Sequence, residues 1–145
     1  MPGTRHKMRK AVMQAIYAWL LEGDAPETVL VETLKRWRVD EHDAARGRTL
    51  LVAVINNHDL LESALSKALE NWSVDRVGSV ELSIIYLIVQ EMMSFPDVPI
   101  EVLLDEGIRL AKEFAGEESA HFINGILDAL AGSVRGEHAQ IEPKP

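Results

Sequence analysis

The sequence from Val80 to Met93 reads Val80-Glu81-Leu82-Ser83-Ile84-Ile85-Tyr86-Leu87-Ile88-Val89-Gln90-Glu91-Met92-Met93, and this run decides the fold. Ten of its fourteen residues are Val, Leu, Ile, Tyr or Met, and the four others stand near its ends. A segment that is apolar on almost every side is typical of a helix surrounded by other elements. Its β-branched residues would also suit a buried strand, so the neighbouring segments have to decide between the two.

Two segments with helical spacing follow this run, and they favour the helix. Pro99 stands where a helix can begin, and apolar residues then recur at three- and four-residue intervals until Gly116 offers a stop. A further segment opens around Ser119 and ends before Gly132. Its apolar stripe consists of Phe122, Ile123, Ile126, Leu127 and Leu130. Three consecutive helices can therefore cover one another in a single core.

The N-terminal half also carries helical patterns. We predict a first helix from Thr4 to near Gly23, a second from Asp24-Ala25-Pro26-Glu27 to Trp37, a third capped by Asp40 or Asp43 and breaking near Asn56-Asn57, and a fourth from Leu60 to Leu69, closed against the core by Trp72. The fold class is therefore all-α, a bundle of about seven helices in two packed three-helix-type subdomains. We expect one domain over residues 1–135, with halves at about 4–70 and 75–132, and a flexible tail at 136–145.

Composition excludes several classes of protein. The 145 residues include no cysteine, which removes disulfides, thiolate metal sites and cysteine nucleophiles. An apolar run of about 20 residues, the length that spans a bilayer, is also missing from the sequence. We therefore expect a cytoplasmic protein with no membrane association.

The charge is unevenly distributed along the chain. The formal net charge is −8, but residues 1–10 hold four basic residues and no acid, so they carry +4 and leave −12 for the rest. These basic residues, Arg5, Lys7, Arg9 and Lys10, fall off the apolar stripe of the first helix, so we expect their charges to point to solvent or to a ligand. A local basic arm can meet phosphate on an acidic protein, because salt screens the more distant charges.

Three separated motifs identify a family. The segments Asp97-Val98-Pro99, Glu106-Gly107-Ile108-Arg109-Leu110-Ala111-Lys112 and Phe122-Ile123-Asn124-Gly125-Ile126-Leu127-Asp128 resemble, in order and spacing, the C-terminal signature of NusB, the bacterial transcription antitermination factor. A weaker likeness extends to Gln14-Ala15-Ile16-Tyr17-Ala18-Trp19, while residues 24–76 match only in helical character. The resemblance implies a NusB-like fold.

The resemblance also implies an RNA-binding function. In that family, a basic cluster at the start of the first helix contacts single-stranded boxA RNA, and here the cluster is Arg5, His6, Lys7, Arg9 and Lys10. By the same resemblance Phe122 and Glu118 lie at the RNA-facing edge, where an aromatic ring can stack an unpaired base. The implied role is antitermination in rRNA operons, on an RNA polymerase elongation complex.

A protein partner is implied as well. Tyr17 and Glu81 match positions through which NusB proteins bind NusE, a small-subunit ribosomal protein. An exposed tyrosine supplies contact area, and a glutamate can pair with a basic partner. NusB relatives occur as monomers and as homodimers, and the sequence leaves a homodimer open.

The sequence departs from the family pattern at four positions. Tyr86 stands for an arginine, Gln90 for a tyrosine, Asp105 for an asparagine and Gly107 for an alanine. We expect these changes to alter the usual internal polar network or the partner-binding edge. We also expect a more acidic surface, so that RNA binding is either weaker than in typical relatives or more dependent on the partner.

Each of these assignments has a plainer alternative. The basic start can be a solvated segment, Phe122 a core residue, Tyr17 ordinary packing, and Glu81 a favourable acid at a helix start. A protein-only adaptor that binds a NusE-like partner without RNA therefore remains the alternative function. A NusB-like domain of an RNA methyltransferase is a weaker one, since the chain ends before such an enzyme could follow.

An enzyme is the remaining alternative. Glu118-Ser119-Ala120-His121 has the Glu-x-x-His spacing of di-iron carboxylate bundles, but those sites need the motif on two helices and only one copy exists. The sequence therefore predicts no enzyme, no metal site and no cofactor.

Overall fold

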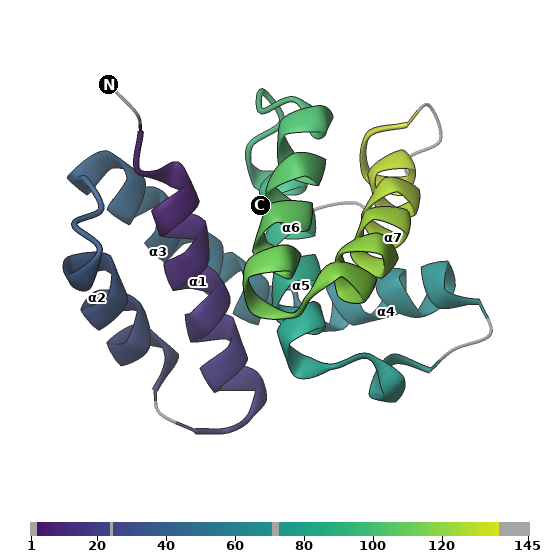
Figure 1. The fold of residues 1–145 in the computed structure, drawn as a ribbon, viewed down its shortest axis with the longest axis horizontal. Coiled ribbons are helices and arrows are strands. Elements are labelled where there is room, and N and C mark those ends of the chain that lie inside the picture. Colours follow the sequence, from purple (N-terminus) through teal and green to yellow (C-terminus); the bar gives the residue numbers. More distant parts are fainter. Residues whose placement is uncertain (1–2, 24, 71–72, 137–145) are drawn as a thin grey trace.

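The computed structural model describes residues 3–23, 25–70 and 73–136. This part of the chain forms seven α-helices and one short 3₁₀ turn, with no strand. The helices are α1 (Arg5–Leu20), α2 (Pro26–Arg36), α3 (Glu41–Asn56), α4 (His58–Leu69), α5 (Ser79–Ser94), α6 (Ile100–Phe114) and α7 (Glu117–Arg135), and the turn is η1 (Val74–Arg76) (Figure 1). The predicted all-α fold is confirmed. Asp24, Trp72 and residues 137–145 of the predicted tail lie outside the described residues.

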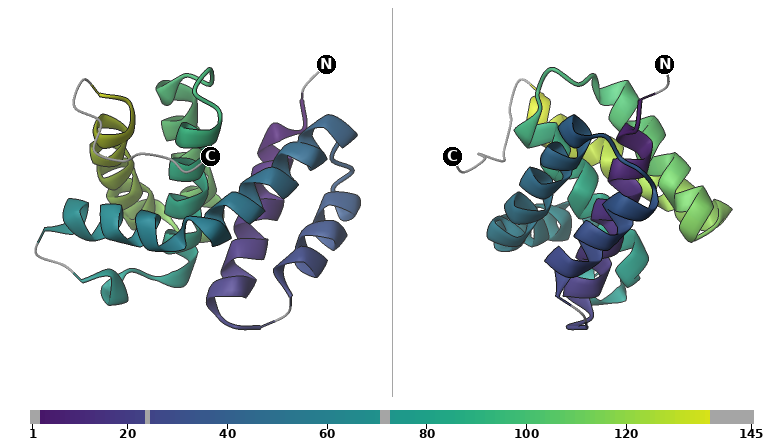
Figure 2. Two further views of the ribbon diagram at one scale, coloured as in Figure 1. Left: turned by 180° about the vertical axis from the view of Figure 1, so that it is seen from behind. Right: turned by 90° about the vertical axis from the view of Figure 1, so that its left-hand side faces the viewer.

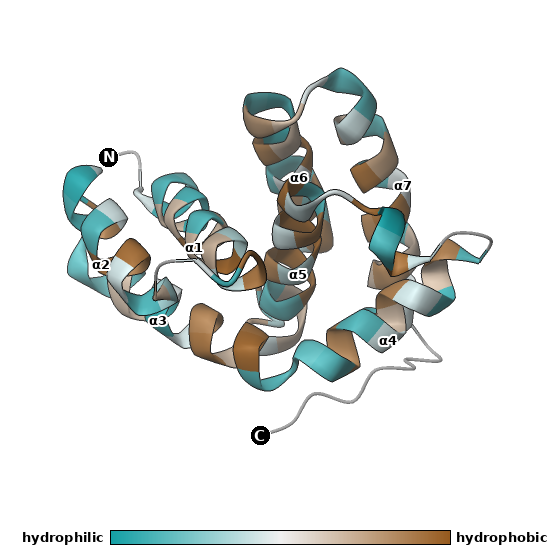
Figure 3. Cartoon of the chain, turned by 90° about the horizontal axis from the view of Figure 1, so that it is seen from below, coloured by the Kyte–Doolittle hydropathy of each residue, from teal (hydrophilic) through white to brown (hydrophobic). Residues whose placement is uncertain are grey.

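Helix α5 is the central element, as its apolar sequence predicts. All residues from Ser83 to Met93 are buried, and the helix packs against α1, α3, α4, α6 and α7. Figure 3 shows hydrophobic residues over most of its length. Burying one Val, Leu or Ile side chain contributes roughly 1.5–3 kcal/mol, so this helix is a main source of stability.

The other helices surround α5. Helix α1 packs against α2 and α3, whereas α6 and α7 pack against each other. Helices α3 and α4 follow one another around Asn57 and cross the back of the molecule (Figure 2). Helix α4 packs on α5 and α7, although the sequence placed residues 58–69 in the N-terminal half. The division into halves at residues 70–75 stays a prediction.

Two predicted helix boundaries have clear physical causes. The Asp40 carboxylate accepts a hydrogen bond from the backbone N–H of Asp43 at 2.8 Å, which caps α3. Between α6 and α7, Gly116 has φ of 110°, a conformation that side chains other than glycine rarely adopt. This residue therefore permits the sharp reversal that brings α7 back against α6.

The predicted end of α7 at Gly132 is wrong, because the helix continues to Arg135. The Arg135 guanidinium donates hydrogen bonds to the carbonyl oxygens of Met92 (3.1 and 2.9 Å), Phe95 (3.0 Å) and Val98. These carbonyls belong to the end of α5 and the turn that follows it, where helix carbonyls lack partners within their own helix. Arg135 therefore ties the end of α7 to the α5–α6 turn.

Among the described helices, none combines the length and the apolar character needed to cross a bilayer.

Candidate nucleic-acid interface

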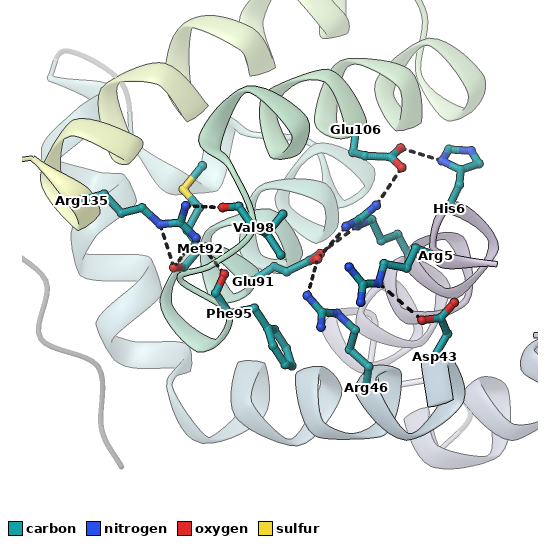
Figure 4. A network of polar contacts seen from close by, with 11 residues as sticks. Arg5, His6, Asp43, Arg46, Glu91, Met92, Phe95, Val98, Glu106 and Arg135 are labelled. Carbon is teal, nitrogen blue, oxygen red and sulfur yellow. Dashed lines mark hydrogen bonds and ion pairs between the residues drawn. The ribbon is translucent and has the colours of Figure 1, made fainter. Parts of the chain in front are cut away.

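Arg9, predicted to face solvent or a ligand, lies in the protein interior. Its residue is 2% exposed. Its Nε and Nη2 donate to the two carboxylate oxygens of Glu91 at 2.9 and 2.7 Å, and its Nη1 donates to Glu106 Oε1 at 2.7 Å (Figure 4). Burial lowers the pKa of Arg9, but the bonds and charges of the two glutamates outweigh that effect and raise it. The prediction that Arg9 points to solvent or a ligand is therefore wrong.

The burial of Arg9 is explained by a carboxylate on α5. Glu91 is fully buried, and a buried carboxylate needs a paired cation. Arg9 follows the buried Met8 on α1 and precedes Met13, which is also buried, by one turn. The apolar stripe of α1 alone does not show this face, because the partners of Arg9 come from α5 and α6. In the sequence, Glu91 within the apolar run of residues 80–93 was the feature that could have indicated a buried cation partner.

His6 connects α1 to α6. Its Nδ1 lies 2.7 Å from Glu106 Oε2 and its Nε2 lies 2.7 Å from Glu113 Oε1. Each ring nitrogen thus faces a carboxylate oxygen of α6, so both nitrogens of His6 are occupied within the fold.

Lys10 shares one of these acids. Its Nζ lies 3.3 Å from Glu113 Oε2 and 4.8 Å from the ring centroid of Trp37. Burial raises the pKa of Glu113, but the hydrogen bonds from His6 and Lys10 outweigh it, and the net pKa lies below its ordinary value. Lys10 is thus partly neutralised within the fold.

Arg5 and Lys7 are the more accessible cations of the cluster. The Arg5 side chain is 42% exposed, and its Nε lies 3.4 Å from Asp43 Oδ1, a loose ion pair. Asp43 also accepts a hydrogen bond from the Thr4 hydroxyl at 2.7 Å. Lys7 is exposed and makes no ion pair within the described part of the chain. The expectation of outward charges therefore holds for Lys7 and in part for Arg5.

A groove brings together three residues that the sequence assigned to binding. It is lined by Arg76, Val77, Glu81, Glu118, Ser119 and Phe122, and has a volume of about 240 Å³. Glu81 comes from the start of α5, whereas Glu118 and Phe122 come from the first turns of α7. Phe122 is half-buried and packs against the core, so one part of its ring is structural and another lines the groove.

Arg76 is the residue of this groove that sequence analysis missed. It is exposed and belongs to η1, a turn of three residues with no periodic pattern. Its cation stands in a groove whose other charged residues, Glu81 and Glu118, are acids. The groove therefore offers an aromatic face together with both signs of charge.

The comparisons with known proteins bear on this arrangement. The profile described as the NusB family matches residues 6–132. The chain belongs to the NusB family. The transcription antitermination protein NusB of Thiobacillus denitrificans is 37% identical over 97% of this chain and 98% of its own length. That of Proteus mirabilis is 37% identical over 92% of this chain and 97% of its own length.

Solved structures agree with the fold. T. maritima NusB superposes with a TM-score of 0.83 and 32% identity, covering 96% of this chain and 95% of that one. A structure of antitermination factors NusB and NusE in complex with double-stranded RNA has a TM-score of 0.79 and 22% identity, covering 89% and 96%. At that identity the second structure supports only the shared fold.

The departures from the NusB pattern lie mostly in the interior. Tyr86 and Gln90 are 1% and 2% exposed, and Gly107 is also buried. Gln90 accepts a hydrogen bond from Asn57 Nδ2 at 3.2 Å and donates to Ser94 Oγ at 2.9 Å. Asp105 alone of the four lies at the surface. Of the four changes, only Asp105 therefore adds an acid to the surface. Gln90 takes part in a local polar network with Asn57 and Ser94.

The two residues predicted to contact NusE have different surroundings. Tyr17 is 37% exposed on α1, and Leu21, four residues further on, is 52% exposed. Glu81 Oε1 accepts a hydrogen bond from the N–H of Gly78 at 3.2 Å, which is the role of an acid at a helix start. A stabilising role for Glu81 is thus visible, while Tyr17 and Leu21 form an exposed apolar pair.

The Glu-x-x-His motif gathers no further ligands. Glu118 and His121 are exposed, and the described residues contain no group of three or more His, Asp or Glu side chains placed to hold a metal ion.

Proposed function

We propose that this chain is a transcription antitermination factor that binds a boxA-like single-stranded RNA together with a NusE-type small-subunit ribosomal protein. The observation that carries the proposal is the groove in which Glu81, Glu118 and Phe122 meet. Residues assigned separately to the protein partner and to RNA thus share one groove. The NusB relatives carry the antitermination name, and a NusB of the same fold was solved with NusE and RNA.

The RNA path that we propose runs from the start of α1 to the start of α7. Glu113, which pairs with His6 and Lys10, stands only four residues before the first residue of α7. Four residues span at most about 14 Å even when fully extended. The basic start of α1 and the groove are therefore close enough for one short strand to contact both.

The residues of the proposed site have different roles. Lys7 and Arg5 contact phosphates, Phe122 stacks a base, and Arg76 and Glu118 contact the same nucleotide segment. His6 and Lys10 support the surface from their pairs with α6, and Arg9 acts only through the fold. Tyr17 contacts the NusE-type partner, with Leu21 beside it. We propose no catalytic step, no cofactor and no metal, and the setting is the cytoplasm, on an RNA polymerase elongation complex transcribing rRNA operons.

The proposal is tested by fluorescence anisotropy. A boxA-like RNA strand and a scrambled strand are titrated with the protein, with and without the NusE-type partner, at two salt concentrations. We expect tighter binding of the boxA-like strand, enhanced by the partner. With three or four phosphates neutralised, log affinity should fall with log salt at a slope of roughly −2 to −3. Equal and weak binding of both strands in all conditions would overturn the proposal.

A second candidate is the protein-only adaptor. It is favoured by the pairing of Arg9 and Lys10 with Glu91, Glu106 and Glu113, which removes much of the positive charge available to phosphate. In the same experiment the adaptor would bind the NusE-type partner with no preference between strands. A homodimer stays a prediction, and light scattering of the purified protein measures it directly.

A further inference from the structure

Arg46 on α3 is a cation without a hydrogen-bonded counter-ion. Its side chain is 10% exposed, and its Nε and Nη2 are buried with no hydrogen-bond partner among the described residues. Nη2 lies 3.5 Å from Glu91 Oε2, close enough for an ion pair but without hydrogen-bond geometry. Buried N–H groups that lack a partner cost free energy, so this arrangement calls for an explanation.

Glu91 makes only a long ion pair with Arg46, whereas it accepts two short hydrogen bonds from Arg9. Both Glu91 oxygens accept hydrogen bonds from Arg9, at 2.9 and 2.7 Å. Two guanidinium groups therefore share one carboxylate, and Arg46 has the longer and weaker contact. Figure 4 shows Arg46 reaching from α3 toward the Glu91 carboxylate that Arg9 already binds.

Phe95 fixes the orientation of Arg46. The Arg46 Cζ lies 3.6 Å from the centroid of the Phe95 ring, a cation–π contact. One face of the guanidinium is thus covered by the ring, and Nε and Nη2 are turned inward. Nη1 is the guanidinium nitrogen that is not fully buried, and it makes no hydrogen bond within the described part of the chain.

Arg5 supplies a second guanidinium beside Arg46. Only its Nε faces Asp43, so its two Nη groups make no hydrogen bond within the described residues. Figure 4 shows the Arg5 and Arg46 side chains extending into the same region from α1 and α3. Burial lowers the pKa of Arg46, and the positive charge of Arg5 lowers it further, so the two cations are close enough to repel each other.

We infer that Arg5 and Arg46 together form a binding site for one phosphate group of the RNA backbone. The donors available to phosphate oxygens are Nη1 of Arg46 and the two Nη atoms of Arg5, and an anion between two guanidiniums removes their mutual repulsion. The site extends the RNA-binding surface from α1 onto α3, and it supplies the cation that Arg9 does not. This inference rests on the proposed RNA-binding function.

The salt dependence of RNA binding tests the site. Each phosphate contact to a single strand contributes about −0.7 to the slope of log affinity against log salt. We expect Arg46→Gln to make the slope shallower by about 0.7 and to weaken binding at low salt. Arg48→Gln is the matched control, because Arg48 lies on the same helix, is 50% exposed and pairs with Glu41 at 2.9 Å. Equal slopes for wild type and Arg46→Gln would overturn the inference.

A further variant separates binding from a structural role. Arg46→Lys keeps the charge but loses the planar guanidinium. If Arg46 binds phosphate, Arg46→Lys restores most of the slope that Arg46→Gln loses. If Arg46 only supports Phe95 and Glu91, both variants weaken RNA binding without changing the slope, which would overturn the inference.

A measurement without RNA separates the site from the proposed function. Inorganic phosphate is titrated into the protein while the Nε–Hε resonances of the arginine side chains are followed by NMR. We expect Arg5 and Arg46 to shift at phosphate concentrations that leave Arg48 unchanged. Equal shifts for all three would overturn the site. If the anisotropy experiment finds no RNA preference while Arg5 and Arg46 still shift, the RNA function fails and the phosphate site stands.

Discussion

Arg9 and Glu91 form a two-point ion pair inside the protein, with Nε 2.9 Å from Oε1 and Nη2 2.7 Å from Oε2. The side chains are 3% and 0% exposed. Glu106 accepts from the remaining terminal nitrogen of Arg9, so one guanidinium holds α1 against both α5 and α6. Burying either charge without the other costs free energy, so removing one residue of the pair should lower the free energy of unfolding measurably.

We expect Arg9→Met to destabilise the protein strongly. The substitution leaves Glu91 buried with only the 3.5 Å ion pair from Arg46, and removing one partner of a buried pair costs about 3–5 kcal/mol. Urea unfolding followed by circular dichroism should show a lower midpoint with an unchanged m-value. Lys7→Met is the control, and it should change the unfolding free energy by less than about 0.5 kcal/mol. Equal midpoints for the two variants would refute the structural role of Arg9.

Phe122 should contribute to RNA affinity through its aromatic face. Stacking on one base is worth ~1–3 kcal/mol, so Phe122→Leu should weaken binding of a boxA-like strand about tenfold while keeping most of the apolar contact with the core. The matched control is Phe114→Leu on α6, which is also half-buried against the core but does not line the groove. If both variants bind RNA equally well, the groove is not the base-stacking site.

Tyr17 should matter for the protein partner and not for RNA alone. Exposed tyrosines at interface centres often cost 2 kcal/mol or more when truncated, so Tyr17→Ala should weaken binding of the NusE-type partner by about 30-fold. Isothermal titration calorimetry with the partner measures this change. Val52→Ala on α3 removes a residue that is 55% exposed and serves as the control. An unchanged partner affinity in Tyr17→Ala would remove α1 from the interface.

The Glu113 contacts should make stability depend on acid pH. The pKa of Glu113 is lowered in the fold from its ordinary value of 4.5, so the unfolded chain binds a proton more readily than the folded one. The stabilisation is therefore present above about pH 4.5 and is lost as the pH falls through the lower folded-state pKa. Urea unfolding between pH 6 and 3 should show this loss, and Glu113→Gln should flatten the curve. An identical pH profile in that variant would contradict the assignment.

The helices could be predicted because their signals are local. The apolar run of α5, the cap at Asp40 and the glycine at position 116 each act within a few residues of the feature they cause. The burial of Arg9 is different, since its partners stand 82 and 97 positions away. The extension of α7 to Arg135 likewise depends on carbonyl groups 37 to 43 positions away.

The candidate site was also predicted only in part from the sequence. Family resemblance indicated Glu81, Glu118 and Phe122, which the fold brings to one groove. Arg76 and Arg46 were missed because no motif or period marks them, and their positions depend on η1 and on the approach of α3 to α5. Arg9 was predicted to contact RNA, whereas Arg46 was not predicted to have a role. In the structure both pair with the carboxylate of Glu91.

The ion pairs of Arg9 also affect the conformational entropy that RNA binding would cost. A basic segment that is unfolded before binding loses conformational entropy when it closes on its target, and that loss reduces affinity. Here the first turns of α1 are held by Glu91 and Glu106 before any strand arrives. Lys7 and Arg5 are therefore presented from a rigid platform, and recognition should proceed by docking onto a preformed surface, without coupled folding of the arm.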